Sequence, residues 1–206
     1  MIMKILAFTD MHGSLKALKK LEKKAKNADI ILNCGDFTIF QQKMPFFLKR
    51  FESFKKPMLI VPGNHESEQD LYAACEGLKY VRCVIDEEVI VEVDGESVII
   101  LAAEGNGFRL KDERFEDVTK KFKHFLKLKE NKGKKIVLMT HAPPYGTSLD
   151  ELMDVQTGNK SIRNFIKEVK PVYSFHGHIE ENNGAEDKIG KTKVINPGPE
   201  GKIVSI

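Results

Sequence analysis

Residues 58–66 read Met-Leu-Ile-Val-Pro-Gly-Asn-His-Glu, an apolar run that ends in a turn and then in three polar residues. A short apolar run bounded by proline and glycine is typical of a buried β-strand. The turn is followed by Asn64 and His65, whose amide oxygen and imidazole nitrogen are groups that bind divalent metal ions. This stretch therefore predicts a strand whose carboxyl end carries candidate metal ligands.

The same arrangement, a short apolar run followed by metal-binding residue types, occurs at four other places. They are 4–8 before Asp10 and His12, 30–32 before Asp36, 136–139 before His141, and 171–175 before His178. A lone histidine or a single Gly-Asp pair is a weak indication of a metal site, whereas five such positions in order, each at the end of a predicted strand, are a stronger one. Because ligands of α/β sheets bind beyond the carboxyl ends of parallel strands, we expect these side chains to converge at one edge.

Helical periodicity separates most of these strands. In the first helix, Leu15, Leu18 and Leu21 form one apolar stripe among lysines. The helices are expected over 14–26, 46–54, 68–75, 112–130 and 161–169.

Two hairpins are expected as well. One spans 89–102 with a type I′ turn at Asp94-Gly95, and the other spans 187–196. Strands that alternate with helices pair in parallel, whereas the strands of a hairpin pair antiparallel. The sequence therefore predicts an α/β protein with mixed sheets covered by helices.

The composition is that of a soluble globular protein, with 41% hydrophobic and 31% charged residues, and the length of 206 residues predicts one domain over 1–206. The net charge of +3 is too small to indicate a nucleic-acid partner. Cys34, Cys75 and Cys83 lack the spacing of a metal site and are expected to be idle thiols in a reducing compartment. With no signal-peptide core and no run of about 20 apolar residues, we expect a cytoplasmic protein without a membrane partner.

The polar residues at the strand ends resemble the ordered motifs of the calcineurin-like metallophosphoesterases: D-x-H, G-D, G-N-H-E or G-N-H-D, H, and G-H-x-H. The resemblance spans nearly the whole chain, and residues 140–146 also resemble small prokaryotic members of that family. It implies a four-layer αββα sandwich, in which two mixed sheets pack together between outer helices. The motifs stand here as Asp10-Met11-His12, Gly35-Asp36, Gly63-Asn64-His65-Glu66, Thr140-His141 and Gly177-His178-Ile179-Glu180.

The resemblance further implies two divalent metal ions with Asp36 bridging them. His65 would bind no metal and would instead face the substrate and help to protonate the leaving oxygen. The implied ligands are Asp10, His12, Asp36 and residue 180 for the first ion, and Asp36, Asn64, His141 and His178 for the second.

The chain departs from the family pattern at its last position, where Glu180 replaces a histidine. We expect Glu180 to bind the first ion directly or through water. Because three carboxylates and one imidazole form a hard ligand set, Mn²⁺ is the ion we expect first, with Fe²⁺, Mg²⁺, Zn²⁺ or Ni²⁺ as alternatives. Two other interpretations stay open: Glu180 points away and the first ion is weak or absent, or His176 replaces it as the ligand.

These implications predict a hydrolase, a metal-dependent phosphoesterase in which a metal-bridging hydroxide attacks the phosphorus of a small phosphoester, with phosphodiesters favoured. A metal-poor, non-catalytic scaffold on the same fold is the first alternative, because of Glu180. A nuclease is the second, but the basic runs at Lys19-Lys20, Lys23-Lys24 and 132–135 are interspersed with acids and are typical of a solvated surface.

Overall fold

The computed structural model describes residues 2–105 and 107–206. The first sheet has the strand order β13-β1-β2-β3-β4, in which β1 to β4 run parallel and β13 pairs antiparallel with β1. Its strands are β1 (Lys4–Phe8), β2 (Ile30–Asn33), β3 (Met58–Ile60), β4 (Val81–Cys83) and β13 (Lys202–Ser205). This sheet brings the ends of β1, β2 and β3 side by side.

The second sheet has the order β11-β12-β10-β7-β6-β5. Its four inner strands are parallel, and β5 and β11 close the two edges as antiparallel hairpin partners. The strands are β5 (Glu87–Val93), β6 (Glu96–Ala102), β7 (Lys135–Met139), β10 (Tyr173–Phe175), β11 (Glu186–Ile189) and β12 (Thr192–Ile195). A small separate hairpin joins β8 (Glu151–Leu152) to β9 (Val155–Gln156).

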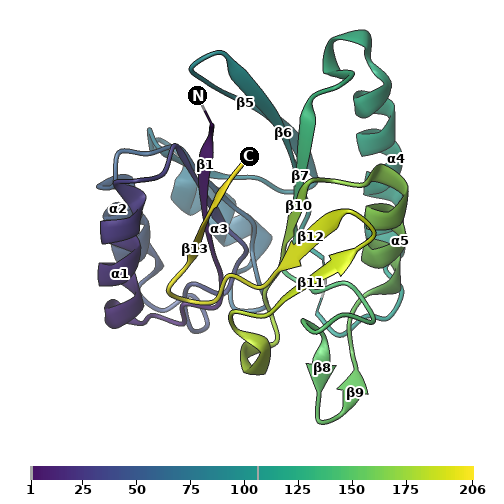
Figure 1. Ribbon diagram of the computed structural model, residues 1–206. Coiled ribbons are helices and arrows are strands. Elements are labelled where there is room, and N and C mark those ends of the chain that lie inside the picture. The colour runs from purple at the N-terminus through teal and green to yellow at the C-terminus, as the bar shows by residue number, and fades with distance from the viewer. Residues whose placement is uncertain (1, 106) are drawn as a thin grey trace.

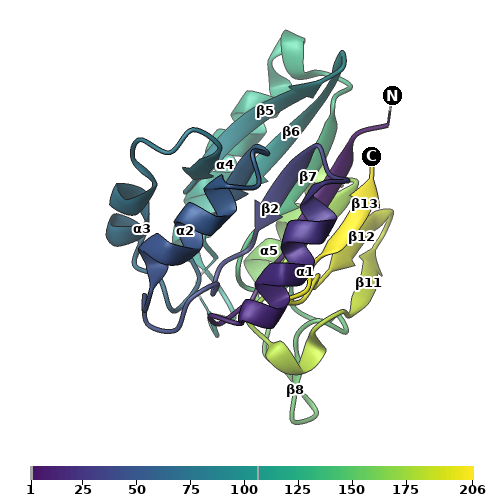
Figure 2. The same cartoon turned by 90° about the vertical axis from the view of Figure 1, so that its left-hand side faces the viewer.

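The helices cover the outer faces of both sheets, as Figure 1 and, after a turn of 90°, Figure 2 show. Apolar side chains of α1, α2 and α3 pack with the first sheet, whereas those of α4 and α5 pack with the second. The helices are α1 (Leu15–Ala25), α2 (Met44–Glu52), α3 (Glu68–Cys75), α4 (Glu113–Lys127) and α5 (Lys160–Val169).

Between the two sheets lies a further apolar layer, in which Ile5 and Leu32 of the first sheet belong to the same cluster as Ile100, Val137 and Phe175 of the second. All five side chains are fully buried. Three apolar layers between four layers of secondary structure confirm the predicted αββα sandwich.

The hairpin of β5 and β6 has the turn that its sequence predicts. Val93 pairs with Glu96, so that only Asp94 and Gly95 lie between the strands. Both residues have positive φ, 51° and 83°, as a type I′ turn requires.

Several local expectations need correction. Leu15 is 56% exposed, and α1 instead buries Ala17, Leu18, Leu21 and Ala25, which form the face of the helix that packs with the first sheet. Strands β4 and β13 were not expected. Each has only a few residues, and β13 is held by backbone pairing with β1 from the other end of the chain.

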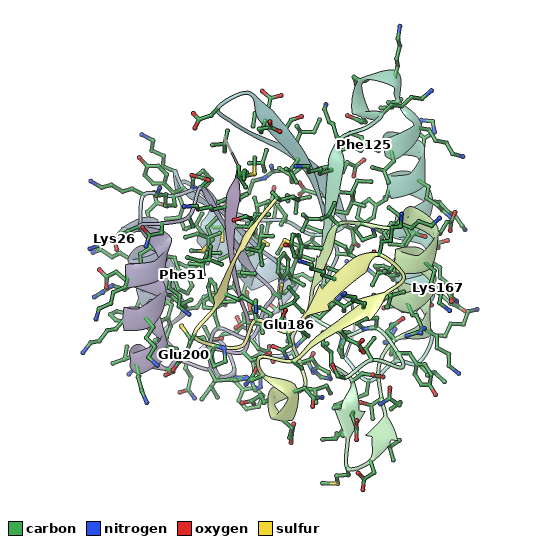
Figure 3. The ribbon with its side chains drawn as sticks, in the orientation of Figure 1. Lys26, Phe51, Phe125, Lys167, Glu186 and Glu200 are labelled. Carbon is green, nitrogen blue, oxygen red and sulfur yellow. The ribbon has the colours of Figure 1, made fainter. Side chains whose placement is uncertain are left out.

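Side chains follow the same layering. Figure 3 shows Phe51 pointing inward from α2, while Lys26 and Lys167 extend into solvent from the outer helix layers. Over the described ranges 2–105 and 107–206, none of the helices combines the length and the apolar character that a membrane crossing needs.

Candidate metal centre

The loops after five parallel strands meet at one edge, which lies beyond the carboxyl end of β1 at the bottom of Figure 1. Backbone hydrogen bonds tie them together: the N–H of Asp10 donates to the Gly35 carbonyl at 3.0 Å, and the N–H of His12 donates to that of Asp36 at 3.0 Å. The two sheets are joined by the N–H of His178, which donates to both carboxylate oxygens of Asp10 at 3.1 and 3.2 Å. The predicted convergence is therefore present.

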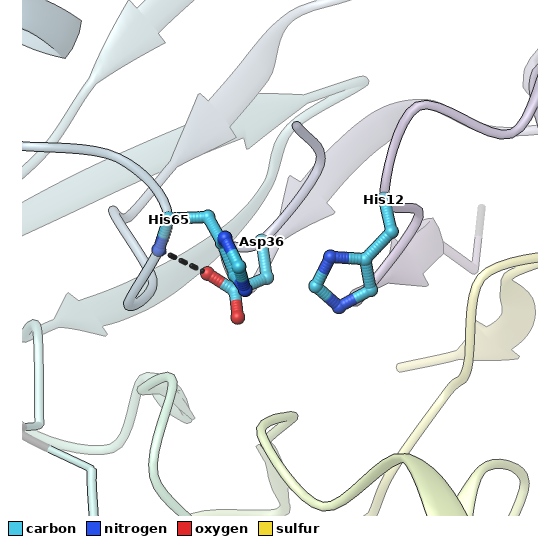
Figure 4. Close-up of side chains that lie close together, drawn as sticks. All are labelled: His12, Asp36 and His65. Carbon is cyan, nitrogen blue, oxygen red and sulfur yellow. Dashed lines mark hydrogen bonds between the residues drawn. The ribbon is translucent and has the colours of Figure 1, made fainter. Parts of the chain in front are cut away.

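Asp36 lies at the middle of this cluster. Its carboxylate belongs to two groups of candidate ligands, one with His12 and His65 and one with Asp10 and His141, and within each group the ligand atoms lie within 4.8 Å of one another. Figure 4 shows the first group, in which the backbone N–H of His65 donates to Asp36 Oδ1 at 2.8 Å. A carboxylate shared by two groups is the arrangement that a bridging ligand needs.

Hydrogen bonds set the ring tautomers of two histidines. His12 Nδ1 lies 3.2 Å from the Thr38 carbonyl, and His141 Nδ1 lies 2.8 Å from the Cys34 carbonyl. A carbonyl only accepts, so in both rings Nδ1 carries the hydrogen and, in the neutral form, Nε2 presents its lone pair. Histidines that bind metal ions are oriented in this way by a backbone carbonyl.

Two buried imidazole nitrogens at this edge make no hydrogen bond within the described chain. Within the part of the chain that the structure describes, Nε2 of His141 and Nε2 of His178 are buried and accept or donate no hydrogen bond. His141 Nε2 lies 3.4 Å from Asp36 Oδ2 and forms an ion pair with it when the ring is protonated. Because buried nitrogens without hydrogen bonds are costly, and because carboxylates and neutral imidazoles suit divalent ions, these residues fit a metal centre.

His65 differs from the other histidines in its tautomer. Its Nδ1 accepts a hydrogen bond from the backbone N–H of Phe40 at 3.1 Å, so the hydrogen of the neutral ring is on Nε2. The ring is half-buried and meets the His12 ring at a centroid distance of 4.9 Å. His65 therefore offers a hydrogen-bond donor to the site where His12 and His141 offer lone pairs.

Glu180 turns toward the cluster. Its Oε1 lies 3.3 Å from Nε2 of His12, although the carboxylate is 61% exposed. Asn64 is exposed at the same edge, and its amide lies beside Gly107, near Cε1 of His178. Both predicted positions thus lie at the centre.

His176 is placed differently. Its ring is fully buried, with Nδ1 2.8 Å from Thr140 Oγ1 and Nε2 2.7 Å from Ser174 Oγ. Burial lowers the pKa of His176 to about 3, which keeps the ring neutral. With both nitrogens engaged inside the protein, this ring has no atom left for a metal ion.

Burial and neighbouring charges shift the pKa values of the cluster in opposite directions. Burial raises the pKa of Asp10 to about 6, although the nearby charge of His141 acts to lower it. Burial also opposes ionisation of Asp36, but its contact with His141 prevails and lowers that pKa to about 2. Likewise, Asp36 outweighs the burial of His141 and raises the imidazole pKa to about 9. Without metal, His141 therefore holds a proton that a cation would replace.

Glu66 supports the cluster from behind. Its buried carboxylate accepts hydrogen bonds from the backbone N–H groups of Asp36, Thr38 and Gly63 at 2.9, 2.9 and 3.2 Å, and from the Thr38 hydroxyl at 2.6 Å. It thereby joins the loop after β2 to the loop after β3. The sequence places Glu66 in a motif, but its role is visible only in these contacts.

The backbone at this edge is strained and tightly packed. Asp10, His12, Asp36 and His178 all have positive φ, between 44° and 77°, which costs about 1–3 kcal/mol at each residue and is typical of functional sites. A Cβ on Gly177 would lie 2.7 Å from Asp10 Oδ2. Glycine is required there because the backbone approaches the carboxylate closely.

A pocket of about 370 Å³ adjoins the cluster and includes Asn64 and His141 in its wall. Its outer wall contains Phe108 and Arg109, neither of which the sequence analysis identified. They lie in a loop after a hairpin strand and carry no metal-binding group. The one feature of the sequence that could have pointed to them is their position in the loop after β6, because β6 is the neighbour of β7 in the sheet.

Comparison with known proteins agrees with this geometry. Residues 3–181 match the family described as calcineurin-like phosphoesterase. The chain is 32% identical to the uncharacterized protein MJ1162 of Methanocaldococcus jannaschii, over 98% of this chain and 91% of that protein.

Solved structures share the fold. The protein TT1561 of Thermus thermophilus superposes with a TM-score of 0.72 at 17% identity, covering 97% of this chain and 91% of that one. Phosphopantetheinyl hydrolase (PptH) of Mycobacterium tuberculosis superposes with a TM-score of 0.65 at 12% identity, covering 96% and 89%. At these identities the similarity extends to the architecture only.

Proposed function

Because the chain belongs to the calcineurin-like phosphoesterase family, we propose that it hydrolyses small phosphodiesters with the help of two divalent metal ions. The observation that carries this proposal is the position of Asp36, whose carboxylate is shared by two groups of candidate ligands. A shared carboxylate would hold two ions close enough to act on one phosphoryl group.

The proposed ligand sets are those that the family motifs imply. His12 Nε2 and Glu180 would hold one ion, and the Nε2 atoms of His141 and His178, which make no hydrogen bond in the described chain, would hold the other. Asp10 would complete the first set, although its carboxylate also lies near His141, and Asn64 would complete the second. Ions bound here would supply a nucleophile derived from water near neutral pH and would neutralise the charge of the phosphoryl oxygens.

His65 acts on the leaving group. The Phe40 N–H fixes the proton of the neutral ring on Nε2, on the side away from the backbone. From there it donates a hydrogen bond to the leaving oxygen of the ester and stabilises the negative charge that develops on that oxygen as the P–O bond breaks. It is the catalytic residue of the proposal, distinct from the metal ligands.

A diester has one substituent that leaves and one that stays, and both need room. The pocket beside Asn64 and His141 offers a volume of about 370 Å³ for a substituent next to the reacting group. This volume favours diesters as substrates over inorganic phosphates and over very small monoesters. We further propose Mn²⁺ as the native ion, because the carboxylate-rich first set is hard, and a cytoplasmic location.

Nuclease activity has weaker support. Lys20 of α1 pairs with Glu200 at 2.5 Å, and Lys24 donates to the carbonyls of Glu200 and Gly201 at 2.9 and 2.6 Å. These ammonium groups bind protein oxygens rather than form a free track for phosphates.

The test is hydrolysis of a chromogenic nitrophenyl diester beside its monoester, after chelation and again after Mn²⁺ is added. We expect turnover only with the ion, faster for the diester, lost in Asp36→Ala, and only partly reduced in His65→Ala because nitrophenolate is a good leaving group. His124→Ala is the matched control, because His124 is exposed on α4.

The competing scaffold interpretation makes the opposite forecast. It requires that no divalent ion restores turnover and that metal analysis finds fewer than two ions per chain. That pair of results would exclude the proposed reaction.

A further inference from the structure

The wall of the pocket beside the metal centre has a part that the metal centre does not use. Asn64 and His141 line the pocket at the metal centre, and Gly107, Phe108 and Arg109 line it as well. The Glu104 carbonyl, which precedes this segment in the chain, accepts the N–H of His141 at 2.8 Å. Because one pocket contains both groups of residues, a substituent on a phosphoryl at the metal centre would extend toward Gly107–Arg109.

Phe108 presents an aromatic ring to this space. It is 61% exposed, yet its ring centroid lies 4.4 Å from that of His178, with the ring planes inclined by 60°. An aromatic side chain gains most when its faces are covered, and this one stays largely exposed despite its contact with His178. Its free surface adjoins the pocket.

Gly107 leaves the entrance open. A Cβ added there would lie 3.5 Å from Asn64 Nδ2 and 3.7 Å from His178 Cε1, so any longer side chain would extend over both residues. With glycine, the segment passes over the candidate ligands without covering them.

Arg109 brings a positive charge to the same wall. Among the described residues no ion pair involves Arg109, whereas the nearby Arg114 is held by Glu68, Asp86 and Glu104. An arginine without a carboxylate partner, next to a site for a phosphoryl group, is suited to attract an anion.

We propose that Phe108 and Arg109 form a subsite for phosphoesters that carry a planar aromatic substituent. Phe108 stacks on the ring of the substituent and determines specificity, while Arg109 attracts the anionic phosphoryl group whatever its substituent. The inference rests on the proposed function, because it assumes that the phosphoryl group binds at the metal centre.

The experiment measures binding of three phosphonates to the Mn²⁺-loaded protein by titration calorimetry: phenylphosphonate, cyclohexylphosphonate and methylphosphonate. Their C–P bonds are not cleaved by hydrolysis of an ester, and they differ only in the substituent. We expect phenylphosphonate to bind about tenfold more tightly than methylphosphonate, equivalent to about 1.4 kcal/mol, with the non-planar cyclohexyl compound between them.

Two variants separate the roles. Phe108→Leu should remove the preference for the phenyl compound and leave methylphosphonate binding unchanged. Arg109→Gln should weaken all three by a similar factor, and Arg109→Lys should restore most of the loss. Phe46→Leu is the matched control, because Phe46 is 45% exposed on α2 and packs on Phe47.

Equal affinity of the wild type for the three compounds would overturn the inference. So would an equal loss for all three in Phe108→Leu, because that is the result expected if Phe108 only holds the His178 ring. Turnover of methyl nitrophenyl phosphate with Mn²⁺ is measured separately. If turnover is absent although the preference for the phenyl compound depends on Phe108, the proposed function fails and the subsite stands. If turnover occurs but Phe108→Leu leaves that preference unchanged, only the subsite is rejected.

Discussion

Oε1 of Glu180 lies 3.3 Å from Nε2 of His12. When the imidazole is neutral, both atoms carry lone pairs, so a cation between them would turn a repulsive contact into an attractive one. The residue at which the chain departs from the family pattern thus faces the first metal position.

Replacement of Glu180 tests this contact. Glu180→Ala should lower the affinity for the first ion by about tenfold or more, so that metal analysis after dialysis finds one Mn²⁺ per chain in place of two. Glu180→His restores the family ligand and should shift the preference toward Zn²⁺, because imidazole is a softer donor than carboxylate. Two retained Mn²⁺ ions in Glu180→Ala would contradict the assignment.

Metal binding should release protons. Near neutral pH, Asp10 is ionised because its pKa is about 6, whereas His141 is protonated because its pKa is about 9. An ion bound to His141 displaces that proton, so about one proton is released per chain. Below pH 6 Asp10 must lose a proton as well. The affinity should therefore rise with pH up to about 9, and more steeply below 6.

Calorimetry in buffers of different ionisation enthalpy measures this release. A binding enthalpy that is the same in all buffers near neutral pH would show that His141 is not protonated in the metal-free protein.

His65 should matter most when the leaving group is poor. Because the Nε2–H group stabilises the charge that develops on the leaving oxygen, His65→Ala should lower kcat by about 100-fold for an alkyl leaving group, and much less for nitrophenolate, whose charge is delocalised over its ring. Metal content should stay at two ions per chain. An equal loss for both leaving groups would assign His65 a role in positioning instead.

Glu66 should contribute chiefly to the stability of the fold. In Glu66→Gln an NH₂ group replaces one oxygen and meets backbone N–H donors, which leaves buried donors without acceptors. We expect a loss of about 2 kcal/mol in the free energy of unfolding of the metal-free protein, measured by urea denaturation. Glu130→Gln, at an exposed position, is the control and should change the free energy by less than about 0.5 kcal/mol.

Gly177 should be needed for the position of Asp10. In Gly177→Ala the new Cβ would lie 1.9 Å from Thr9 Oγ1 and 2.7 Å from Asp10 Oδ2, so the carboxylate must move. We expect at least about tenfold weaker Mn²⁺ binding. Gly190→Ala is the control: its Cβ meets nothing within 4 Å, and any cost of its φ of +62° should leave metal binding unchanged.

Much of the architecture could be predicted from local patterns. Apolar runs such as 4–8 and 30–32 became β1 and β2 because a buried strand needs only a few apolar residues in succession. The turn at Asp94-Gly95 formed as expected, because its conformation depends on those two residues alone. Strand β13 could not be predicted, since it is held by pairing with β1 across nearly the whole chain.

By itself, the sequence determined which residues lie at the strand ends, in what order and with what chemistry, because strand and helix patterns are local. Only the tertiary structure decided what each of them does. His12, His65 and His176 are the same residue type at similar positions, yet one presents a lone pair, one a proton and one neither. Their hydrogen-bond partners Thr38, Phe40 and Ser174 set this difference, and a ring nitrogen has one role only once a folded neighbour occupies the other.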